Sequence, residues 1–202
     1  MKDLHNNEAL DKLYKILESY VTQRTIPSLS VLLKEPVHHY LKEIKEIGTS
    51  DIEELISSLN EESVMAAAYV RGEGDFQIRV LVYLPEKESK NLASKLLGQN
   101  VLDELDALGK SSISEIGNML SASIFNAISH KTGSKISSTV PGFAIDTVRT
   151  LFEGVTVEAT NESPSLILAS FDLKATKSSL VISLLIILDP SEATKILLKE
   201  RV

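Results

Sequence analysis

The fold is decided by a stretch that reads, from Ser111 to Pro141, SSISEIGNMLSASIFNAISHKTGSKISSTVP. Ser111, Glu115 and Asn118 are four and three residues apart, so at about 100° per residue they project from one face of an α-helix. Apolar residues recur at helical spacing on the opposite face, namely Ile113, Ile116, Leu120, Ile124 and Ala127. The pattern predicts a helix that is anchored by one side and presents an acid and an amide on the other.

The elements around this helix follow from the same periodicity rules. We predict one long helix over Asp103–Lys131 with a break near Gly109, and Gly133 is well placed to terminate it. An extended piece at Lys135–Thr139 should precede Pro141, and Ile145–Phe152 suggests a helical turn. The motif helix is therefore expected to lead into a short strand, after which the chain returns beside the helix.

The rest of the chain shows the same order of elements twice, at a shift of roughly one hundred residues. In the first half we predict a helix at 7–24, a short apolar turn at 29–33, an extended segment at 37–47 and a short helix at 50–59. Two strands at 64–71 and 76–84, joined at Gly72-Glu73-Gly74-Asp75, and a helix at 86–97 complete this half. In the second half a strand pair at 165–174 and 179–188 precedes a last helix that ends at Lys199.

Two helix-rich units that each donate a hairpin would most economically pool their strands into one sheet. The expected fold is α/β of the α+β type, with pseudo-two-fold duplicated helix–hairpin units that form one mostly antiparallel central sheet flanked by long helices. We expect a single domain over residues 1–202, made of repeats at about 1–100 and 101–202.

Composition excludes several classes of protein. The chain has 202 residues, 43% of them hydrophobic, which is enough to bury a substantial core. It has no cysteine, and hence no disulfide framework or thiolate metal site. A net charge of −7 argues against a nucleic-acid partner, which would require a basic stripe. No stretch approaches 18 apolar residues and no signal peptide is evident, so we expect a soluble, cytoplasmic protein without membrane insertion.

Other short patterns favour structural explanations. His38 and His39 would point to opposite faces of a strand, so a shared metal ion is not expected. Gly72-Glu73-Gly74 lacks the third glycine of a dinucleotide fingerprint, and neither a phosphate-binding loop nor a serine-hydrolase elbow occurs. The glycosylation-like sequence at Asn161 is expected to be a coincidence in a loop.

The combined spacing Ser-x-x-x-Glu-x-x-Asn, followed after 22 residues by Pro141, resembles the signature of the CheC-type chemotaxis phosphatases. This family includes CheC, CheX and FliY and is related to the middle domain of FliM. The resemblance extends through SEIGNMLSASIFNAISHKTG and VPGFAID, and in length and order of elements the chain is most similar to CheC.

This resemblance implies a reaction of two-component signalling, hydrolysis of the aspartyl phosphate of the response regulator CheY. The regulator supplies its own Mg²⁺, so no cofactor is expected on this chain. The helper mainly has to place water in line with phosphorus, and the resemblance gives that role to Asn118, whose amide both donates and accepts hydrogen bonds. Glu115, one turn earlier, is suited to pair with a regulator lysine and orient the two proteins.

Three further positions are expected to support the site. Ser111 either bonds the partner or is tolerated on an exposed face. Gly117 costs about 1 kcal/mol in a helix relative to alanine, and either it is harmless or it removes a side chain beside Asn118 where another backbone approaches. Pro141 is expected to fix the turn that brings the chain back beside the helix.

The first half departs from the two-site pattern known in the family. A shift of one hundred residues places Asp11, Lys15, Glu18 and Leu41 at the motif positions. Lys15 reverses the charge that would meet a lysine, so we predict one active site. The alternative function is a non-catalytic or weakly catalytic docking module that binds the response regulator, the receptor deamidase CheD, or both.

Overall fold

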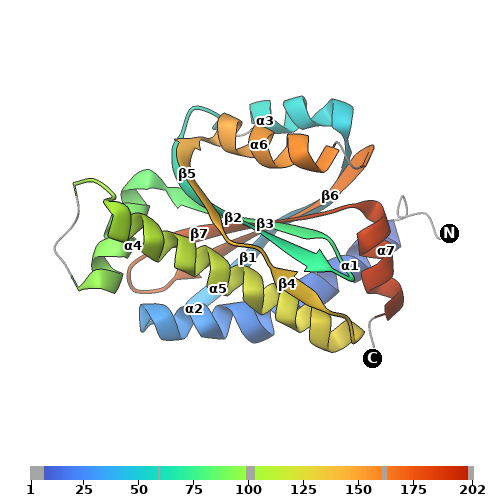
Figure 1. Ribbon diagram of the computed structural model, residues 1–202, viewed down its shortest axis with the longest axis horizontal. Helices are drawn as coiled ribbons and strands as arrows, with labels where there is room; N and C mark the ends of the chain where they lie inside the picture. The colour runs from blue at the N-terminus through green and yellow to red at the C-terminus, as the bar shows by residue number, and fades with distance from the viewer. Residues whose placement is uncertain (1–6, 59, 99–102, 161–162, 200–202) are drawn as a thin grey trace.

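In the computed structural model, which describes residues 7–58, 60–98, 103–160 and 163–199, seven strands form one antiparallel sheet (Figure 1). The strands are β1 Val37–Gly48, β2 Val64–Gly74, β3 Ile78–Pro85, β4 Ile136–Ser138, β5 Gly142–Thr147, β6 Ser165–Ala175 and β7 Val181–Leu188. They lie in the order β1-β6-β7-β3-β2, and β4 and β5 both pair with β2. The expected antiparallel sheet is confirmed.

The two halves of the chain interlock within this sheet. Hairpins β2–β3 and β6–β7 meet where β3 pairs with β7. Leu81 lies opposite Leu185 and Val82 opposite Leu184, so an offset of 103 residues, which takes Leu81 to Leu184 and Val82 to Leu185, exchanges the two pairs. Each half also supplies the strand that flanks the other half's hairpin, because β1 pairs with β6 and β5 pairs with β2. Neither half could complete its part of the sheet alone.

Helices cover both faces of the sheet (Figure 1). They are α1 Asn7–Tyr20, the π-helix η1 Val21–Thr25, α2 Ile26–Leu33, the 3₁₀ turn η2 Thr49–Asp51, α3 Ile52–Ser58, α4 Glu86–Leu97, α5 Ala107–Thr132, α6 Val148–Thr160 and α7 Pro190–Lys199. Helices α3 and α6 lie on one face, and α1, α2, α4, α5 and α7 lie on the other. Among the described helices, none is long and apolar enough to cross a membrane.

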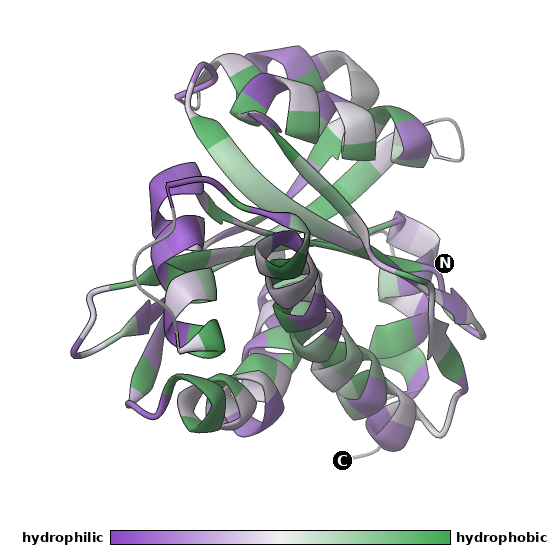
Figure 2. Cartoon of the chain, turned by 60° about the vertical axis from the view of Figure 1, so that its left-hand side comes forward, coloured by the Kyte–Doolittle hydropathy of each residue, from purple (hydrophilic) through white to green (hydrophobic). Residues whose placement is uncertain are grey.

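Each face of the sheet has its own hydrophobic core, because successive side chains of a strand point to opposite faces. In β2, Ala66 and Val70 join the larger core under the long helices, whereas Ala67 joins the smaller core under α3 and α6. In β7, Ile186 and Ile187 divide in the same way. Hydrophobic residues accordingly run along the central strands, while hydrophilic residues are distributed along the helices (Figure 2).

The first helical region is longer than the sequence predicts. Instead of a helix at 7–24 and a separate turn at 29–33, one continuous helical run extends from α1 through η1 into α2. Pro27 lies within this run, directly after the π-helix, without ending it, and the run ends at Lys34 in the left-handed conformation with φ of 56°. The expectation of a turn after Pro27 was therefore wrong.

Two boundaries in the second half also differ from the prediction. The motif helix starts at Ala107, not Asp103, because the Asp106 carboxylate accepts a hydrogen bond from the Gly109 N–H at 2.7 Å and caps the helix there; no break occurs at Gly109. The predicted turn at 145–152 combines two elements, since residues up to Thr147 belong to β5 and α6 begins at Val148. Asn161 lies outside the described residues.

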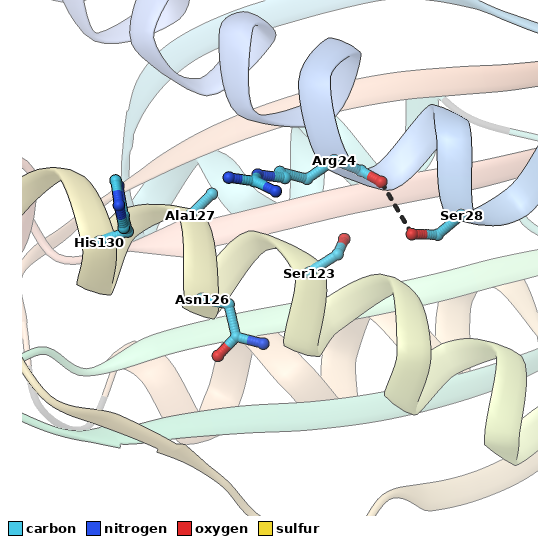
Figure 3. Close-up of a pocket in the computed structure, with 6 residues that line it drawn as sticks. All are labelled: Arg24, Ser28, Ser123, Asn126, Ala127 and His130. Carbon is cyan, nitrogen blue, oxygen red and sulfur yellow. Dashed lines mark hydrogen bonds between the residues drawn. The ribbon is translucent and has the colours of Figure 1, made fainter.

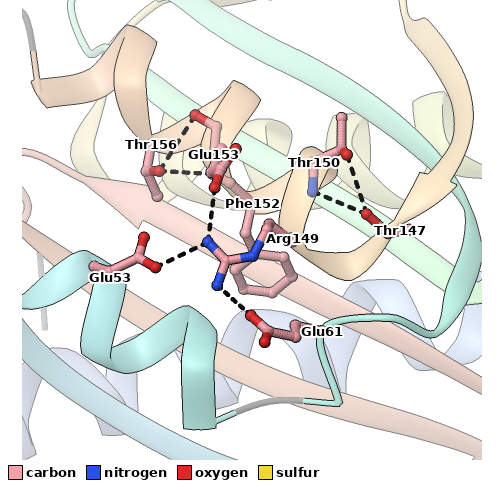
Figure 4. Close-up of polar contacts among 8 residues, drawn as sticks. All are labelled: Glu53, Glu61, Thr147, Arg149, Thr150, Phe152, Glu153 and Thr156. Carbon is pink, nitrogen blue, oxygen red and sulfur yellow. Dashed lines mark hydrogen bonds and ion pairs between the residues drawn. The ribbon is translucent and has the colours of Figure 1, made fainter.

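The outer helices α3 and α6 are joined by one arginine (Figure 4). The Arg149 guanidinium, at the start of α6, donates to Glu53 Oε1 on α3 at 2.9 Å and to Glu153 Oε1 at 3.0 Å. It also pairs with Glu61, which precedes β2. Arg149 thereby links both outer helices to the segment that leads into the sheet.

A second polar junction holds the opposite end of the fold. Glu35, whose side chain is 2% exposed, accepts hydrogen bonds from Lys95 Nζ at 2.8 Å and from the Ser178 hydroxyl and N–H at 2.7 and 2.9 Å. The Lys177 N–H donates to the same carboxylate at 2.6 Å. These donors, Lys95 first, lower the pKa of Glu35 from 4.5 to about 2. The ionised carboxylate thus joins the end of α2 to α4 and the β6–β7 turn.

Acid should weaken this junction. Because the folded-state pKa of Glu35 is depressed, its stabilisation is fully present above its ordinary pKa of 4.5 and is lost as pH falls toward about 2. We expect Glu35→Gln to lower the free energy of unfolding at neutral pH. Between about pH 4.5 and 2, the free energy of unfolding should fall less steeply in the variant than in the parent. Urea unfolding followed by circular dichroism across this range measures both effects. The exposed Glu104→Gln is the control, and parallel pH curves for parent and Glu35→Gln would contradict the expectation.

Candidate functional site

The predicted two-faced helix is present as α5. Its five apolar motif residues are all buried, whereas Ser111 and Glu115 are exposed and Asn118 is half-buried. The helix is anchored at both ends, by the Asp106 cap and by Gly133, which takes the left-handed conformation with φ of 67°. A rigid element therefore carries the acid and the amide one turn apart, on its solvent side.

Gly117 lets this helix approach the sheet closely. A Cβ atom placed on Gly117 would lie 2.3 Å from the Cβ of Ala68 in β2, a separation that real side chains do not adopt. The glycine is buried, so the neighbour that needs its missing side chain is the protein's own sheet. The backbone that approaches Gly117 is therefore that of β2 in the protein's own sheet, and the glycine sets the depth at which Asn118 emerges.

Strands β4 and β5 lie beside the flank of α5 that carries the motif. Phe125 follows Asn118 by seven residues, about two turns, and therefore lies on nearly the same flank. A Cβ atom on Gly72 would meet both Phe125 and Ile136 of β4, so these residues converge there. Pro141 lies between β4 and β5, which both pair with β2. The chain thus returns along the motif helix, with Pro141 at the junction.

The motif side chains are not among the polar contacts that join the described elements. Within the described ranges, the structure shows no hydrogen bond or ion pair made by the side chains of Ser111, Glu115 or Asn118 to another described residue. A carboxylate and an amide that are left unpaired on a rigid helix keep their hydrogen-bonding capacity for another molecule. This is the chemistry of a binding surface that can also orient a water molecule.

Helix α1 repeats the burial pattern of α5 at an offset of one hundred residues. Buried positions coincide at Leu13, Ile16, Leu17, Tyr20 and Val21, which correspond to Ile113, Ile116, Gly117, Leu120 and Ser121. The exposed positions coincide as well: Asp11 and Lys15 are exposed, and Glu18 is half-buried like Asn118. The alignment that pairs Lys15 with Glu115 and Glu18 with Asn118 thus matches the surface of both helices.

Glu18, the counterpart of Asn118 on α1, makes hydrogen bonds within the chain. Glu18 Oε1 accepts a hydrogen bond from the Tyr14 hydroxyl at 2.9 Å and lies 3.2 Å from His39 Nε2. His39, and then Tyr14, hold the pKa of Glu18 below its ordinary value. Sequence reasoning found Glu18 but missed these partners, because His39 lies on β1 and reaches α1 only through the tertiary fold. The first-half surface therefore presents an engaged acid where the second half presents a free amide.

In the described part of the chain, no group of three or more histidine, aspartate or glutamate side chains is arranged to hold a metal ion. His38 and His39 are neighbours on β1, and His39 is engaged with Glu18.

Several solved structures are similar to this chain. No protein-family model matches it, and no curated protein sequence does so. FliY from Thermotoga maritima superposes with a TM-score of 0.74 at 15% identity, covering 98% of both chains. The FliM middle domain from H. pylori gives 0.67 at 13% identity, covering 96% of this chain and 99% of that one.

A third solved structure is a complex. CheX from Borrelia burgdorferi, crystallised with CheY, BeF₃ and Mg²⁺, matches with a TM-score of 0.50 at 12% identity, over 90% of this chain and 98% of the matched chain. The chain therefore has the fold shared by FliY, the FliM middle domain, CheX and CheC-like proteins. That fold is the one that the spacing around Asn118 predicts.

The close contact at Gly117 makes a testable prediction. Gly117→Ala should lower the free energy of unfolding by about 1–3 kcal/mol, because the added methyl group would overlap Ala68. Gly154→Ala is the matched control, since a Cβ there meets nothing within 4 Å and should gain up to about 1 kcal/mol of helix propensity. Urea denaturation of both variants distinguishes the packing cost of the added methyl group from its effect on helix propensity. If Gly117→Ala is as stable as Gly154→Ala, the contact does not limit helix placement.

Proposed function

We propose that this protein is a phosphatase that accelerates hydrolysis of the aspartyl phosphate of a CheY-like response regulator. The observation that carries the proposal is the pair Glu115 and Asn118, which stand one turn apart on the solvent side of α5 without partners among the described residues. The motif spacing and the fold shared with CheX and FliY support it.

Asn118 is given the catalytic role. An aspartyl phosphate is already activated, so the main requirement is a water molecule aligned opposite the leaving carboxylate oxygen. The amide accepts a hydrogen bond from the water through its oxygen and donates one toward the phosphoryl oxygens through its nitrogen, without a change in its own protonation. Gly117 and the Asp106 cap hold its backbone, so little ordering is needed when the partner docks.

Glu115 is given the positioning role. Its exposed carboxylate can pair with a lysine of the regulator and set the register of α5 across the interface. A CheY-like regulator carries its own Mg²⁺, which neutralises the phosphoryl group. The structure of CheX with CheY, BeF₃ and Mg²⁺ supports this division of labour, because a protein of the same fold docks such a regulator.

The same reasoning assigns one site to the chain. In α1, Lys15 would repel a regulator lysine, and Glu18 is held by Tyr14 and His39. A carboxylate at that position would also meet the negative phosphoryl group with like charge. The first half is therefore proposed to serve as scaffold.

A docking module without catalysis is the second candidate. The TM-score with the FliM middle domain, 0.67, favours it, because one fold can present the same helix as a binding surface alone. CheD remains a further proposed partner in either case, on the sequence resemblance to CheC. Unlike a phosphatase, a docking module does not require the amide of Asn118.

Removal of the amide separates the two candidates. We expect Asn118→Ala to slow phosphate release from a phosphorylated regulator in Mg²⁺ by about a hundredfold, since one positioned hydrogen-bonding group is lost. Binding to the BeF₃-activated regulator should change little. Asn91→Ala, which removes a half-buried asparagine from α4, is the control. Phosphate release by Asn118→Ala at the parental rate would refute the catalytic assignment of Asn118. If parent and variant both leave the regulator's own rate of phosphate release unchanged, the docking module is favoured.

Introducing the acid and the amide of the motif into α1 tests the assignment of a single site. Lys15→Glu combined with Glu18→Asn would recreate the acid and the amide on α1 at equivalent, similarly exposed positions. In an Asn118→Ala background we expect this double change to restore part of the phosphatase rate. Glu18→Asn alone, which keeps the repelling lysine, is the control. A folded double variant with no gain would contradict the equivalence of the two helix surfaces.

A further inference from the structure

A polar groove separates the C-terminal half of α5 from η1 and α2 (Figure 3). One part of it is lined by Arg24, Ser28, Ser123, Asn126, Ala127 and His130. The adjoining part shares three of these residues and adds Tyr20, Gln23 and Lys131. Arg24 from η1 and His130 from α5 extend along the groove from its two walls. No aspartate or glutamate is among the lining residues of either part.

The two walls are joined by a direct hydrogen bond. Thr25 Oγ1 and Ser123 Oγ lie 2.6 Å apart, and Thr25 is fully buried. The Ser28 hydroxyl donates to the Arg24 carbonyl at 2.9 Å, and the Ser123 hydroxyl donates to the Leu120 carbonyl at 2.7 Å. The serines are therefore engaged in holding the walls, and the cationic side chains are left to face a ligand.

One wall of the groove contains an extra residue. Buried positions of the two halves match at an offset of 100 up to Val21, but after the π-helix they match at 99, as at Leu29 with Ile128 and Leu33 with Thr132. A π-helix accommodates one added residue in a helix and is found frequently at functional sites. The insertion lies where Arg24 enters the groove, and α5 has no such irregularity.

Arg24 also differs from two other arginines in its pairing. Arg71 pairs with Glu73 and Glu158, and Arg149 pairs with three glutamates. Within the described ranges, the guanidinium of Arg24 has no carboxylate partner. An arginine that faces a groove without acids keeps its guanidinium N–H groups available for an external anion.

We propose that this groove binds a small phosphate-bearing molecule. The Arg24 guanidinium supplies paired N–H donors suited to phosphate oxygens, the His130 ring supplies an N–H, and Lys131 adds positive charge. The site is distinct from the motif surface, because the groove lies on the opposite flank of α5 and begins about one turn beyond Asn118. The proposal is independent of phosphatase activity, although both sites share one rigid helix.

Inorganic phosphate is the probe, added to the full chain while backbone amide resonances are followed by NMR. We expect saturable shifts confined to residues of η1, the start of α2 and the second half of α5. Sodium chloride of equal ionic strength should not reproduce them. Shifts that match those in chloride, or that fail to saturate, would overturn the proposal.

A matched pair of variants assigns the site to Arg24. Because one charge-assisted contact is lost, Arg24→Gln should weaken phosphate binding about tenfold or more. Arg71→Gln removes the same charge from an exposed arginine on β2 and should leave the affinity unchanged. Both positions are exposed, and thermal unfolding verifies that each variant is folded. Equal affinities for parent and Arg24→Gln would refute the assignment.

Discussion

The close contact between Gly117 and Ala68 determines where the motif helix lies. Two facing small residues let α5 approach β2 to a distance that any side chain at position 117 would prevent. Asn118 follows the glycine directly, so the depth of this contact also sets how far the amide stands above the surface. In α1 the corresponding residue is Leu17, which is fully buried, and that helix must pack through a bulkier side chain. The placement of the functional surface therefore depends on an interaction of the core.

Much of the architecture was predictable because its determinants are local. Apolar strands such as β7, with turn residues on both sides, specify hairpins, and two hairpins at a shift of roughly one hundred residues predict a pooled sheet. The errors occurred where tertiary contacts decide. Gly142–Thr147 becomes a strand because β2 offers it a hydrogen-bonding edge, and Val21–Thr25 forms a π-helix although nothing in its composition distinguishes it from an α-helix.

The candidate site also has parts that local sequence predicts and parts that depend on tertiary contacts. Helical spacing alone places Ser111, Glu115 and Asn118 on one face, since three residues of a single helix need no long-range information. The reason for Gly117, the partners of Glu18 and the position of Arg24 all depend on strands or helices remote in sequence. Helical spacing can thus identify a candidate surface. The residues that position that surface, or that occupy its counterpart on α1, can be identified only from the tertiary structure.

The matching burial of α1 and α5 shows why the two helices can differ on their outer faces without loss of the fold. The larger core contains the apolar faces of both α1 and α5. The opposite face is not constrained by that core, and in α1 it carries Lys15 together with Glu18, which bonds to His39 on β1. An engaged carboxylate contributes to the structure but loses hydrogen-bonding capacity toward a partner. Of these two matching helices, α1 therefore makes polar contacts through Glu18, whereas α5 leaves the side chains of Glu115 and Asn118 without polar partners among the described residues.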